Sequence, residues 1–316
     1  MTEIDPLLDG LNPQQSEAVT HAGGPLLVVA GAGSGKTRVL TRRIAYLMSR
    51  RNIAPYQILA ITFTNKAAGE MKERVADLVG PIAKSMWVST FHSACVRILR
   101  QEATRLGYSN SFSIYDAADS QRLITIVAKE LNLDPKRYPA RQFQSMISNA
   151  KNELLGPQDY LNAASNQFEQ VVADVYAVYQ QRLIRANAMD FDDLILKTVE
   201  VLQRHPEAKA RLRSRFRHVL VDEYQDTNHA QYILVKELVG TELEGQAPAE
   251  LCVVGDADQS IYGFRGATIR NILQFELDYP NARTVLLEQN YRSTQNILNA
   301  ANAVITKNES RKEKNL

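Results

Sequence analysis

Residues 26–37 read LLVVAGAGSGKT, and this stretch decides the fold. The apolar run Leu26-Leu27-Val28-Val29 predicts a buried strand, and an amphipathic stretch ending near Met48 predicts a helix after the loop. A glycine-rich loop that ends in Gly-Lys-Thr between a strand and a helix is typical of a P-loop, which binds phosphate groups. A turn that binds nothing is the alternative, and the offset of Gly-Lys-Thr after the strand argues against it.

The chemistry of this loop predicts an ATP site. Its glycines let backbone N–H groups surround phosphate oxygens, and the start of the helix adds the positive end of its dipole. Lys36 is expected to reach the β- and γ-phosphates, and Thr37 to place its hydroxyl on Mg²⁺. Ala30 replaces the usual first glycine at the strand end, where a positive φ is least needed. We expect nucleotide contacts from Ala30, Gly31, Ala32, Gly33, Ser34, Gly35, Lys36 and Thr37.

The composition is that of an ordinary globular protein. The chain has 316 residues, enough for two domains, with 45% hydrophobic and 23% charged residues. A net charge of +2 argues neither for nor against binding of nucleic acid. Two cysteines, Cys95 and Cys252, provide neither a disulfide framework nor a zinc-binding spacing. Because the first ten residues lack a signal-peptide pattern and no apolar run is long enough to span a membrane, we expect a cytoplasmic protein without membrane contacts.

Apolar runs that alternate with helical patterns predict the fold class. The expected strands are Leu26–Ala30, Ile58–Phe63, Trp87–Thr90, His218–Val221, Leu251–Val254 and Thr284–Leu287. Such alternation predicts an α/β fold with a parallel sheet covered by helices on both faces. Ligands of such sheets bind beyond the carboxyl ends of the strands, and the polar motifs of this chain follow those ends.

The middle of the chain, residues 116–192, shows helical patterns and no good strand. Asp116 can cap a helix that carries apolar residues at helical spacing. A second helix has Phe143, Ile147, Ala150 and Leu154 on one face, and a third has Phe168, Val172, Val175 and Tyr179. We therefore expect an all-helical subdomain inserted into the α/β core.

Two carboxylates follow the buried run His218–Val221. Asp222 is expected to hold Mg²⁺, and Glu223 to orient and deprotonate the attacking water. Gln259, after the next predicted strand, could hydrogen-bond the γ-phosphate or that water. A solvated acidic loop is the alternative for this pair, and the P-loop in the same chain weakens it.

Two aromatic residues, Tyr262 and Phe264, follow Gln259 within a glycine-containing loop. Aromatic side chains just past a phosphate contact favour stacking on nucleic-acid bases, which tolerates any base sequence. Packing in the core is the alternative for either ring.

Several motifs in a fixed order give the chain a family resemblance. They are Leu11-Asn12-Pro13-Gln14-Gln15, Ala30–Thr37, Thr62-Phe63-Thr64-Asn65-Lys66-Ala67-Ala68, Ser89-Thr90-Phe91-His92, Asp190-Phe191-Asp192-Asp193, Asp222–Asp226, Gly255–Gly266 and Leu287-Glu288-Gln289-Asn290-Tyr291-Arg292-Ser293. With this set the chain resembles the UvrD/PcrA/Rep group of superfamily 1 DNA helicases. A P-loop with an acidic pair would fit many ATPases, whereas the whole set is specific to this group.

The resemblance implies roles for further residues. Gln15 is similar to the glutamine that reads the adenine edge, Tyr291 to the residue that stacks on adenine, and Arg292 to the arginine finger at the γ-phosphate. Arg38 is expected close enough to touch the nucleotide. The residues expected on the single-stranded DNA track are Phe63, Thr64, Asn65, His92, Tyr262, Phe264 and Arg265. The family often has Trp at the position of Phe264, and His92 could equally be a satisfied polar group under a loop.

The resemblance also implies a domain plan and an activity. It predicts a RecA-like motor domain over 1–115 and 193–290, a helical subdomain over 116–192, and the start of a second motor domain at 291–316. The expected activity is 3′-to-5′ movement on single-stranded DNA with duplex unwinding, driven by ATP and Mg²⁺, in DNA repair or replication. Expected partners are single-stranded DNA and junctions with duplex DNA. We expect an N-terminal fragment that hydrolyses ATP poorly and cannot unwind DNA alone.

Three alternatives stay open. The chain could be the motor part of a RecB- or AddA-like helicase–nuclease, although such chains usually carry larger insertions. It could be a DNA-binding module that uses ATP only as a clamp, although Glu223 argues against this. A P-loop kinase would give no reason for the Tyr262–Phe264 loop.

Overall fold

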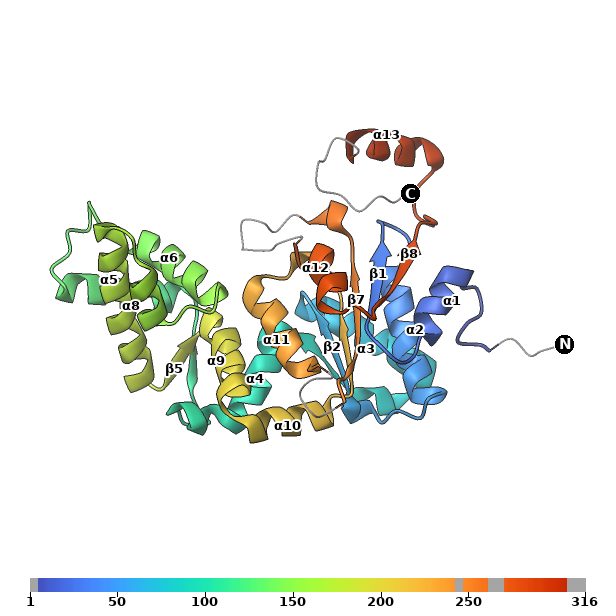
Figure 1. Cartoon of the computed structure of the whole chain (residues 1–316), viewed down its shortest axis with the longest axis horizontal. Coiled ribbons are helices and arrows are strands. Elements are labelled where there is room, and N and C mark those ends of the chain that lie inside the picture. Colours follow the sequence, from blue (N-terminus) through green and yellow to red (C-terminus); the bar gives the residue numbers. More distant parts are fainter. Residues whose placement is uncertain (1–4, 242–246, 261–269, 306–316) are drawn as a thin grey trace. The chain divides into compact units, whose positions relative to one another are not determined.

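The computed structural model describes residues 5–241, 247–260 and 270–305. It separates into two compact units (Figure 1). The sheet unit combines Met1–Phe91, Ala210–Thr227 and Leu238–Leu316, and the helical unit combines His92–Lys209 and Asn228–Glu237. The domain limits expected from the sequence stay a prediction.

The sheet unit is built on a parallel sheet with the strand order β3-β2-β6-β7-β1-β8. Its strands are β1 (Leu26–Ala30), β2 (Ile58–Thr62), β3 (Trp87–Thr90), β6 (His218–Val221), β7 (Glu250–Gly255) and β8 (Arg283–Leu287). The predicted α/β class is confirmed. The predicted limits of β1, β3 and β6 are those observed, whereas β2 ends one residue earlier than expected, β8 begins one residue earlier, and β7 is longer by one residue at each end.

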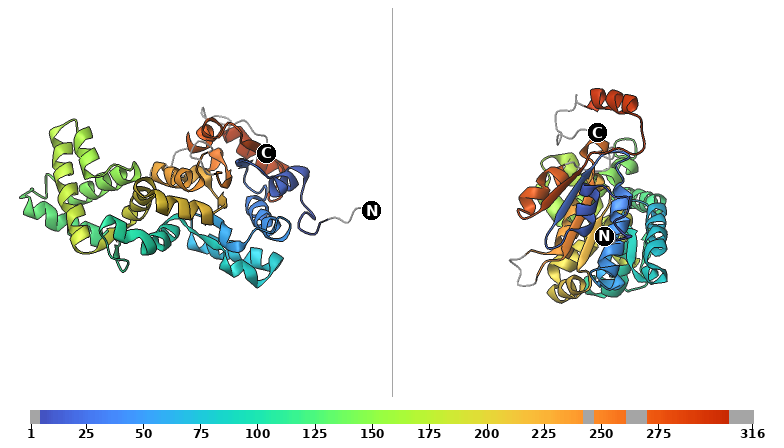
Figure 2. Two further views of the ribbon diagram at one scale, coloured as in Figure 1. Left: turned by 60° about the horizontal axis from the view of Figure 1, so that its bottom comes forward. Right: turned by 90° about the vertical axis from the view of Figure 1, so that its right-hand side faces the viewer.

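Helices surround this sheet. They are α1 (Pro13–Thr20), α2 (Lys36–Ser49), α3 (Asn65–Val79), α12 (Arg270–Asp278) and α13 (Gln295–Ile305), with 3-10 turns η1 (Pro55–Gln57), η2 (Pro81–Ser85), η4 (Tyr224–Asp226) and η6 (Ala257–Gln259). Helices α10 (Pro206–Arg215) and α11 (His229–Val239) contain residues of both units. Helices α1, α2 and α3 lie side by side, as the blue part of the ribbon shows (Figure 2).

Strands β1, β2 and β6 are buried at every position because both faces of the sheet are covered there. Leu26, Val28 and Ala30 on one face of β1 join a core cluster with residues of α1, α2 and α3. Leu27 and Val29, on the opposite face, are buried as well. Burial on both faces explains why these strands read as continuous apolar runs rather than as an alternation.

The helical unit contains α4 (Phe91–Glu102, whose first residue belongs to the sheet unit), η3 (Ala103–Leu106), β4 (Ser113–Tyr115), α5 (Ala117–Glu130), α6 (Ala140–Asn152), α7 (Pro157–Ala163), α8 (Gln167–Arg185), β5 (Ala188–Asp190) and α9 (Phe191–Arg204). Asp116 caps α5 through its carboxylate, as predicted. The expectation of no strand within 116–192 was wrong, since β5 pairs in parallel with β4. Three residues are too few for a period-two pattern, so periodicity cannot detect such a strand.

The three predicted helix faces form the core of this unit. Phe143, Ile147 and Ala150 of α6 pack with Val172 and Tyr179 of α8, among others. Leu154, expected on the same face as Phe143, lies beyond the end of α6 with a φ of 61°. The left-handed backbone at Leu154 is incompatible with the helix, so the helix predicted from the apolar pattern was too long at this end.

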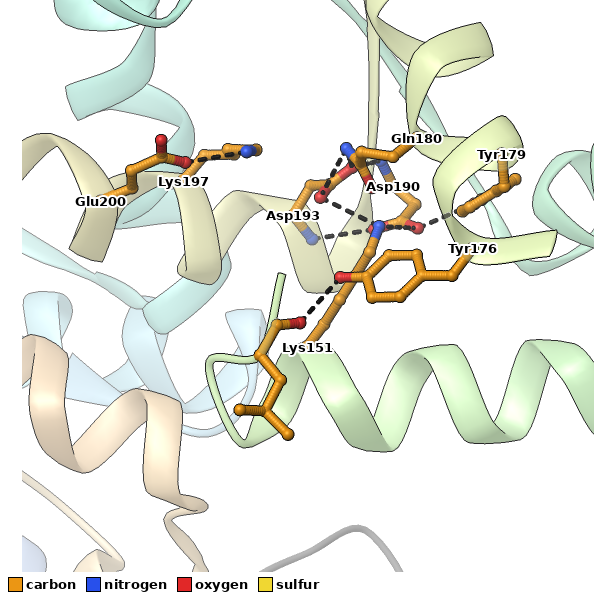
Figure 3. A network of polar contacts seen from close by, with 9 residues as sticks. Lys151, Tyr176, Tyr179, Gln180, Asp190, Asp193, Lys197 and Glu200 are labelled. Atoms are coloured by element: carbon orange, nitrogen blue, oxygen red, sulfur yellow. Dashed lines mark hydrogen bonds and ion pairs between the residues drawn. The ribbon is translucent and has the colours of Figure 1, made fainter. Parts of the chain in front are cut away.

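A buried ionic network lies at the start of α9 (Figure 3). The Lys151 ammonium is fully buried and lies 2.7 Å from Asp190 Oδ2 and 2.9 Å from Asp193 Oδ1. The Tyr179 hydroxyl donates to Asp190 Oδ2 at 2.8 Å. Although burial opposes the charge, the two carboxylates raise the pKa of Lys151 well above its ordinary value, and Lys151 lowers the pKa of Asp190.

Asp192 gives this network a pH dependence. Burial, and then the neighbouring Asp190, raise the pKa of Asp192 to about 6, with Lys151 opposing them. The folded state therefore binds a proton more tightly than the unfolded state, and stability should fall as pH rises from about 4 to about 6. We expect Asp192→Asn to remove this decline, so the free energies of unfolding of variant and unchanged protein, measured in urea, should diverge between pH 4 and pH 6. Parallel curves would contradict this.

In the described part of the chain, no helix is both long and apolar enough to cross a bilayer.

Candidate nucleotide-binding site

Four segments that contain predicted site residues follow the carboxyl ends of β1, β6, β7 and β8. The parallel register aligns Val29 of β1 with Gly255 of β7 and with Leu286 of β8, so the segments after these strands leave the same edge of the sheet. This is the edge at which ligands of open parallel sheets bind.

The loop between β1 and α2 has the conformation that its glycines allow. Gly33 and Gly35 have φ values of 73° and 92°, which favour glycine, and Gly35 is the N-cap of α2. Lys36 and Thr37 are the first residues of that helix. The buried Ser34 hydroxyl donates to the Gly31 carbonyl at 2.7 Å. This is the arrangement of a helix N-terminus that binds an anion.

Lys36 is held by two of the other predicted catalytic residues, Glu223 and Gln259. Its ammonium lies 3.1 Å from Glu223 Oε2 and donates to Gln259 Oε1 at 3.4 Å. The sequence therefore predicted correctly that these segments meet. Gln259 in turn donates through its amide to Asp256.

The acidic pair lies where β6 turns. Burial, and then the charge of Glu223, raise the pKa of Asp222 to about 6. The Glu223 N–H donates to Asp222 Oδ1 at 3.0 Å, and Glu223 has a left-handed φ of 48°. A non-glycine residue in this region is uncommon and marks a constrained turn, here at the predicted general base.

Asn12 hydrogen-bonds to both residues that are expected to bind the adenine, Gln15 and Tyr291. Gln15 is buried and donates to the Ser34 carbonyl of the loop at 2.9 Å. Asn12 caps α1 in a reciprocal arrangement with Gln15, and its amide donates to the Tyr291 hydroxyl at 3.0 Å. The Tyr291 side chain is 55% exposed, so its ring is accessible. Arg38 lies in the first turns of α2 and reaches the Asp9 carbonyl at 3.5 Å.

Arg292 also lies at the loop. A Cβ placed on Gly33 would come within 2.7 Å of Arg292 Cβ, so the segment after β8 touches the loop directly. The Arg292 N–H donates to Asn290 Oδ1 at 2.8 Å.

Two residues that the sequence did not indicate belong to this site. Gln225 donates to Glu223 Oε2 at 2.8 Å and accepts from the Asp256 N–H at 2.9 Å, which links the segments after β6 and β7. Asn290, after β8, donates to the Ala32 carbonyl of the loop. Both residues lie within motifs of the sequence, Asp222–Asp226 and Leu287–Ser293. Because neither side chain is charged, nothing else in the sequence marks them as site residues.

The predicted DNA residues that the structure describes belong to the segments that follow β2 and β3. Phe63 is half-buried, Thr64 caps α3 by accepting from the Ala67 N–H at 3.1 Å, and Asn65 is exposed in the first turn of that helix. His92 belongs to the helical unit. Its ring contacts the ring of Phe191 edge to face, with the two ring centroids 5.8 Å apart. Burial lowers the pKa of His92. Tyr262, Phe264 and Arg265 lie outside the described residues.

Comparison with known proteins places this site in a family. Residues 11–280 match the UvrD/REP helicase N-terminal domain. The chain is 64% identical over 317 aligned residues to the ATP-dependent DNA helicase UvrD1 of Mycobacterium tuberculosis strain H37Rv, covering 99% of this chain and 41% of that protein. It is 56% identical over 310 residues to the ATP-dependent DNA helicase PcrA of Bacillus subtilis, covering 98% of this chain and 41% of that protein. The chain thus spans about two fifths of the length of these relatives, and it belongs to the UvrD/REP helicase family.

Proposed function

We propose that this chain carries the ATP-binding part of an ATP-dependent DNA helicase that moves 3′ to 5′ on single-stranded DNA and unwinds duplex DNA. The observation that carries the proposal is the Lys36–Glu223–Gln259 cluster beside a complete phosphate-binding loop. The names of the relatives, both ATP-dependent DNA helicases, support it.

The ion pair suggests how binding prepares hydrolysis. Lys36 is bonded to Glu223 in this structure. When the triphosphate enters the loop, its β- and γ-oxygens compete for the Lys36 ammonium, because phosphate carries more charge than one carboxylate. Glu223 then loses its cation and is free to accept a proton from water, which is the role of a general base. Gln259, bonded to the same ammonium, is placed to sense this exchange.

The residues present fit a magnesium ion. Mg²⁺ is bound in such sites by one or two carboxylates or hydroxyls together with substrate phosphates rather than by a full protein cage. Asp222 and Thr37 would supply these groups. The ion would neutralise charge on the β- and γ-oxygens.

The remaining residues take the roles that the family resemblance implies. Gln15 and Tyr291 bind the adenine, Arg38 lies next to the nucleotide, and Arg292 approaches the γ-phosphate. Phe63, Thr64, Asn65 and His92, with Tyr262, Phe264 and Arg265, contact single-stranded DNA and its junctions with duplex. Changes at the γ-phosphate reach the DNA through the segment after β7, which contains both Gln259 and the aromatic pair.

Lys36→Ala tests the nucleotide site. Loss of a charge-assisted hydrogen bond to phosphate should weaken MgATP binding by roughly 10- to 150-fold. Isothermal titration or a fluorescent nucleotide measures the affinity, and DNA-stimulated ATP hydrolysis should disappear. Lys66→Ala is the matched control, because the Lys66 side chain is 87% exposed on α3. Equal affinities in the two variants would refute the assignment, whereas MgATP binding without any hydrolysis by the full-length enzyme would favour a module that uses ATP only as a clamp.

A further inference from the structure

Asn290 joins the segment after β8 to the phosphate-binding loop. Its Nδ2 donates to the Ala32 carbonyl at 2.5 Å. Its Oδ1 accepts from the N–H groups of Arg292 and Ser293, both at 2.8 Å. Because the oxygen serves two backbone donors, the amide can have only one orientation, and the nitrogen must face the loop.

The segment after β8 comes so close to the phosphate-binding loop that position 33 requires a glycine. A Cβ at Gly33 would come within 2.9 Å of Asn290 Nδ2, as well as within 2.7 Å of Arg292 Cβ. The next residue reinforces the contact, since the Tyr291 N–H donates to the Gly33 carbonyl at 3.0 Å. Two consecutive carbonyls of the loop are therefore held by the segment that carries Tyr291 and Arg292.

The geometry of the peptide bond gives this contact a consequence for phosphate binding. In a trans peptide the C=O of one residue and the N–H of the next point in opposite directions. Donors that hold the carbonyls of Ala32 and Gly33 thus fix the directions of the Gly33 and Ser34 N–H groups, and the Ser34 N–H donates to the Gly31 carbonyl at 3.3 Å. Gln15 does the same at the third peptide, where its amide holds the Ser34 carbonyl at 2.9 Å.

We propose that Asn290 is a positioning residue that preorganises the phosphate-binding loop for the triphosphate, in addition to holding Tyr291 and Arg292 in place. This inference rests on the proposed function, because it assumes that the loop binds nucleotide. Orienting the N–H groups before binding removes a cost that the nucleotide would otherwise have to meet.

The test separates the phosphate chain from the adenine. Inorganic tripolyphosphate and ATP share the phosphates, but only ATP offers a ring to Tyr291. We expect Asn290→Asp and Asn290→Ser each to weaken both ligands by a similar factor, roughly three- to tenfold for the loss of one hydrogen bond. Asn290→Ser controls for the charge that aspartate adds near the phosphates. Tyr291→Ala should weaken ATP and leave tripolyphosphate unchanged.

Asn166→Asp is the matched control. Asn166 accepts from the Glu169 N–H at 3.0 Å as the N-cap of α8, and aspartate fills that role equally well. It should leave both affinities and the melting temperature unchanged. Hydrogen exchange of the Ser34 amide, which donates to the Gly31 carbonyl at 3.3 Å, reports on the order of the loop when no ligand is added, and it should speed up in both Asn290 variants.

The outcomes are distinct. If the Asn290 variants weaken ATP but not tripolyphosphate, Asn290 acts only through Tyr291 and the inference is wrong. If both affinities and the exchange rates are unchanged, it is also wrong. If the unchanged protein binds neither ligand, the proposed function fails instead.

Discussion

Replacing Glu223 with glutamine should lower the rate of ATP hydrolysis by roughly 10²- to 10⁴-fold, the contribution of a positioned general base. Glutamine keeps the size of the side chain and can still accept a hydrogen bond from Lys36, but it cannot take a proton from water. The affinity for MgATP should stay near that of the unchanged protein or rise, since Lys36 no longer has to leave a carboxylate. Single-turnover hydrolysis with radiolabelled ATP, together with equilibrium binding, measures the two quantities separately.

Glu70→Gln provides the control for this variant. Glu70 pairs loosely with Lys66, at 3.9 Å on the exposed face of α3, so neutralising it should change neither quantity. If binding and hydrolysis fall together in Glu223→Gln, Glu223 holds the loop in shape and is not the base.

The second large effect concerns stability. Lys151→Met should lower the free energy of unfolding by about 3–5 kcal/mol, because methionine fills the space of lysine but leaves Asp190 and Asp193 buried without their cation. Chemical denaturation monitored by circular dichroism measures the change. The pKa of Asp190, which Lys151 now lowers, should rise at the same time, and this shift is visible in a pH series.

A comparison variant and a rescue make this prediction specific. Arg182→Met also removes one positive charge from the helical unit, but Arg182 pairs with Glu130 at the surface, where their side chains are 41% and 42% exposed, so the loss should be below about 1 kcal/mol. Adding Asp190→Asn and Asp193→Asn to Lys151→Met should recover part of the stability, since no buried carboxylate is then left unpaired. Equal losses for Lys151→Met and Arg182→Met would show that the network adds nothing beyond a surface ion pair.

Strands buried on both faces were the most predictable elements. β1 is a short apolar run, and β3 and β6 contain the aromatic and β-branched residues that favour strands. The meeting of Lys36 with Glu223 was predictable as well, because parallel strands place the residues that follow them at one edge.

Other features leave no mark in a single sequence. Lys151 belongs to an amphipathic helix, where a lysine normally faces water, and only the fold reveals that Asp190 and Asp193 surround it. Asn290 is an uncharged residue in a turn, so no periodicity distinguishes it from a solvent-exposed asparagine. β5 is too short to show a period. In each case the missing information is a contact between residues far apart in the chain.

The order of the strands has a consequence for how the protein is made. Both neighbours of β1 come from the far end of the sequence, since Leu26 pairs with Cys252 of β7 and with Arg283 of β8. At about 5–20 residues per second, a ribosome needs on the order of 10–45 s to add the residues that separate β1 from β7. During that time β1 has none of the partners that it has in the finished sheet, and closing so long a loop makes its pairing a late step in folding. The phosphate-binding loop is thus synthesised long before the strands that flank β1 in the finished sheet.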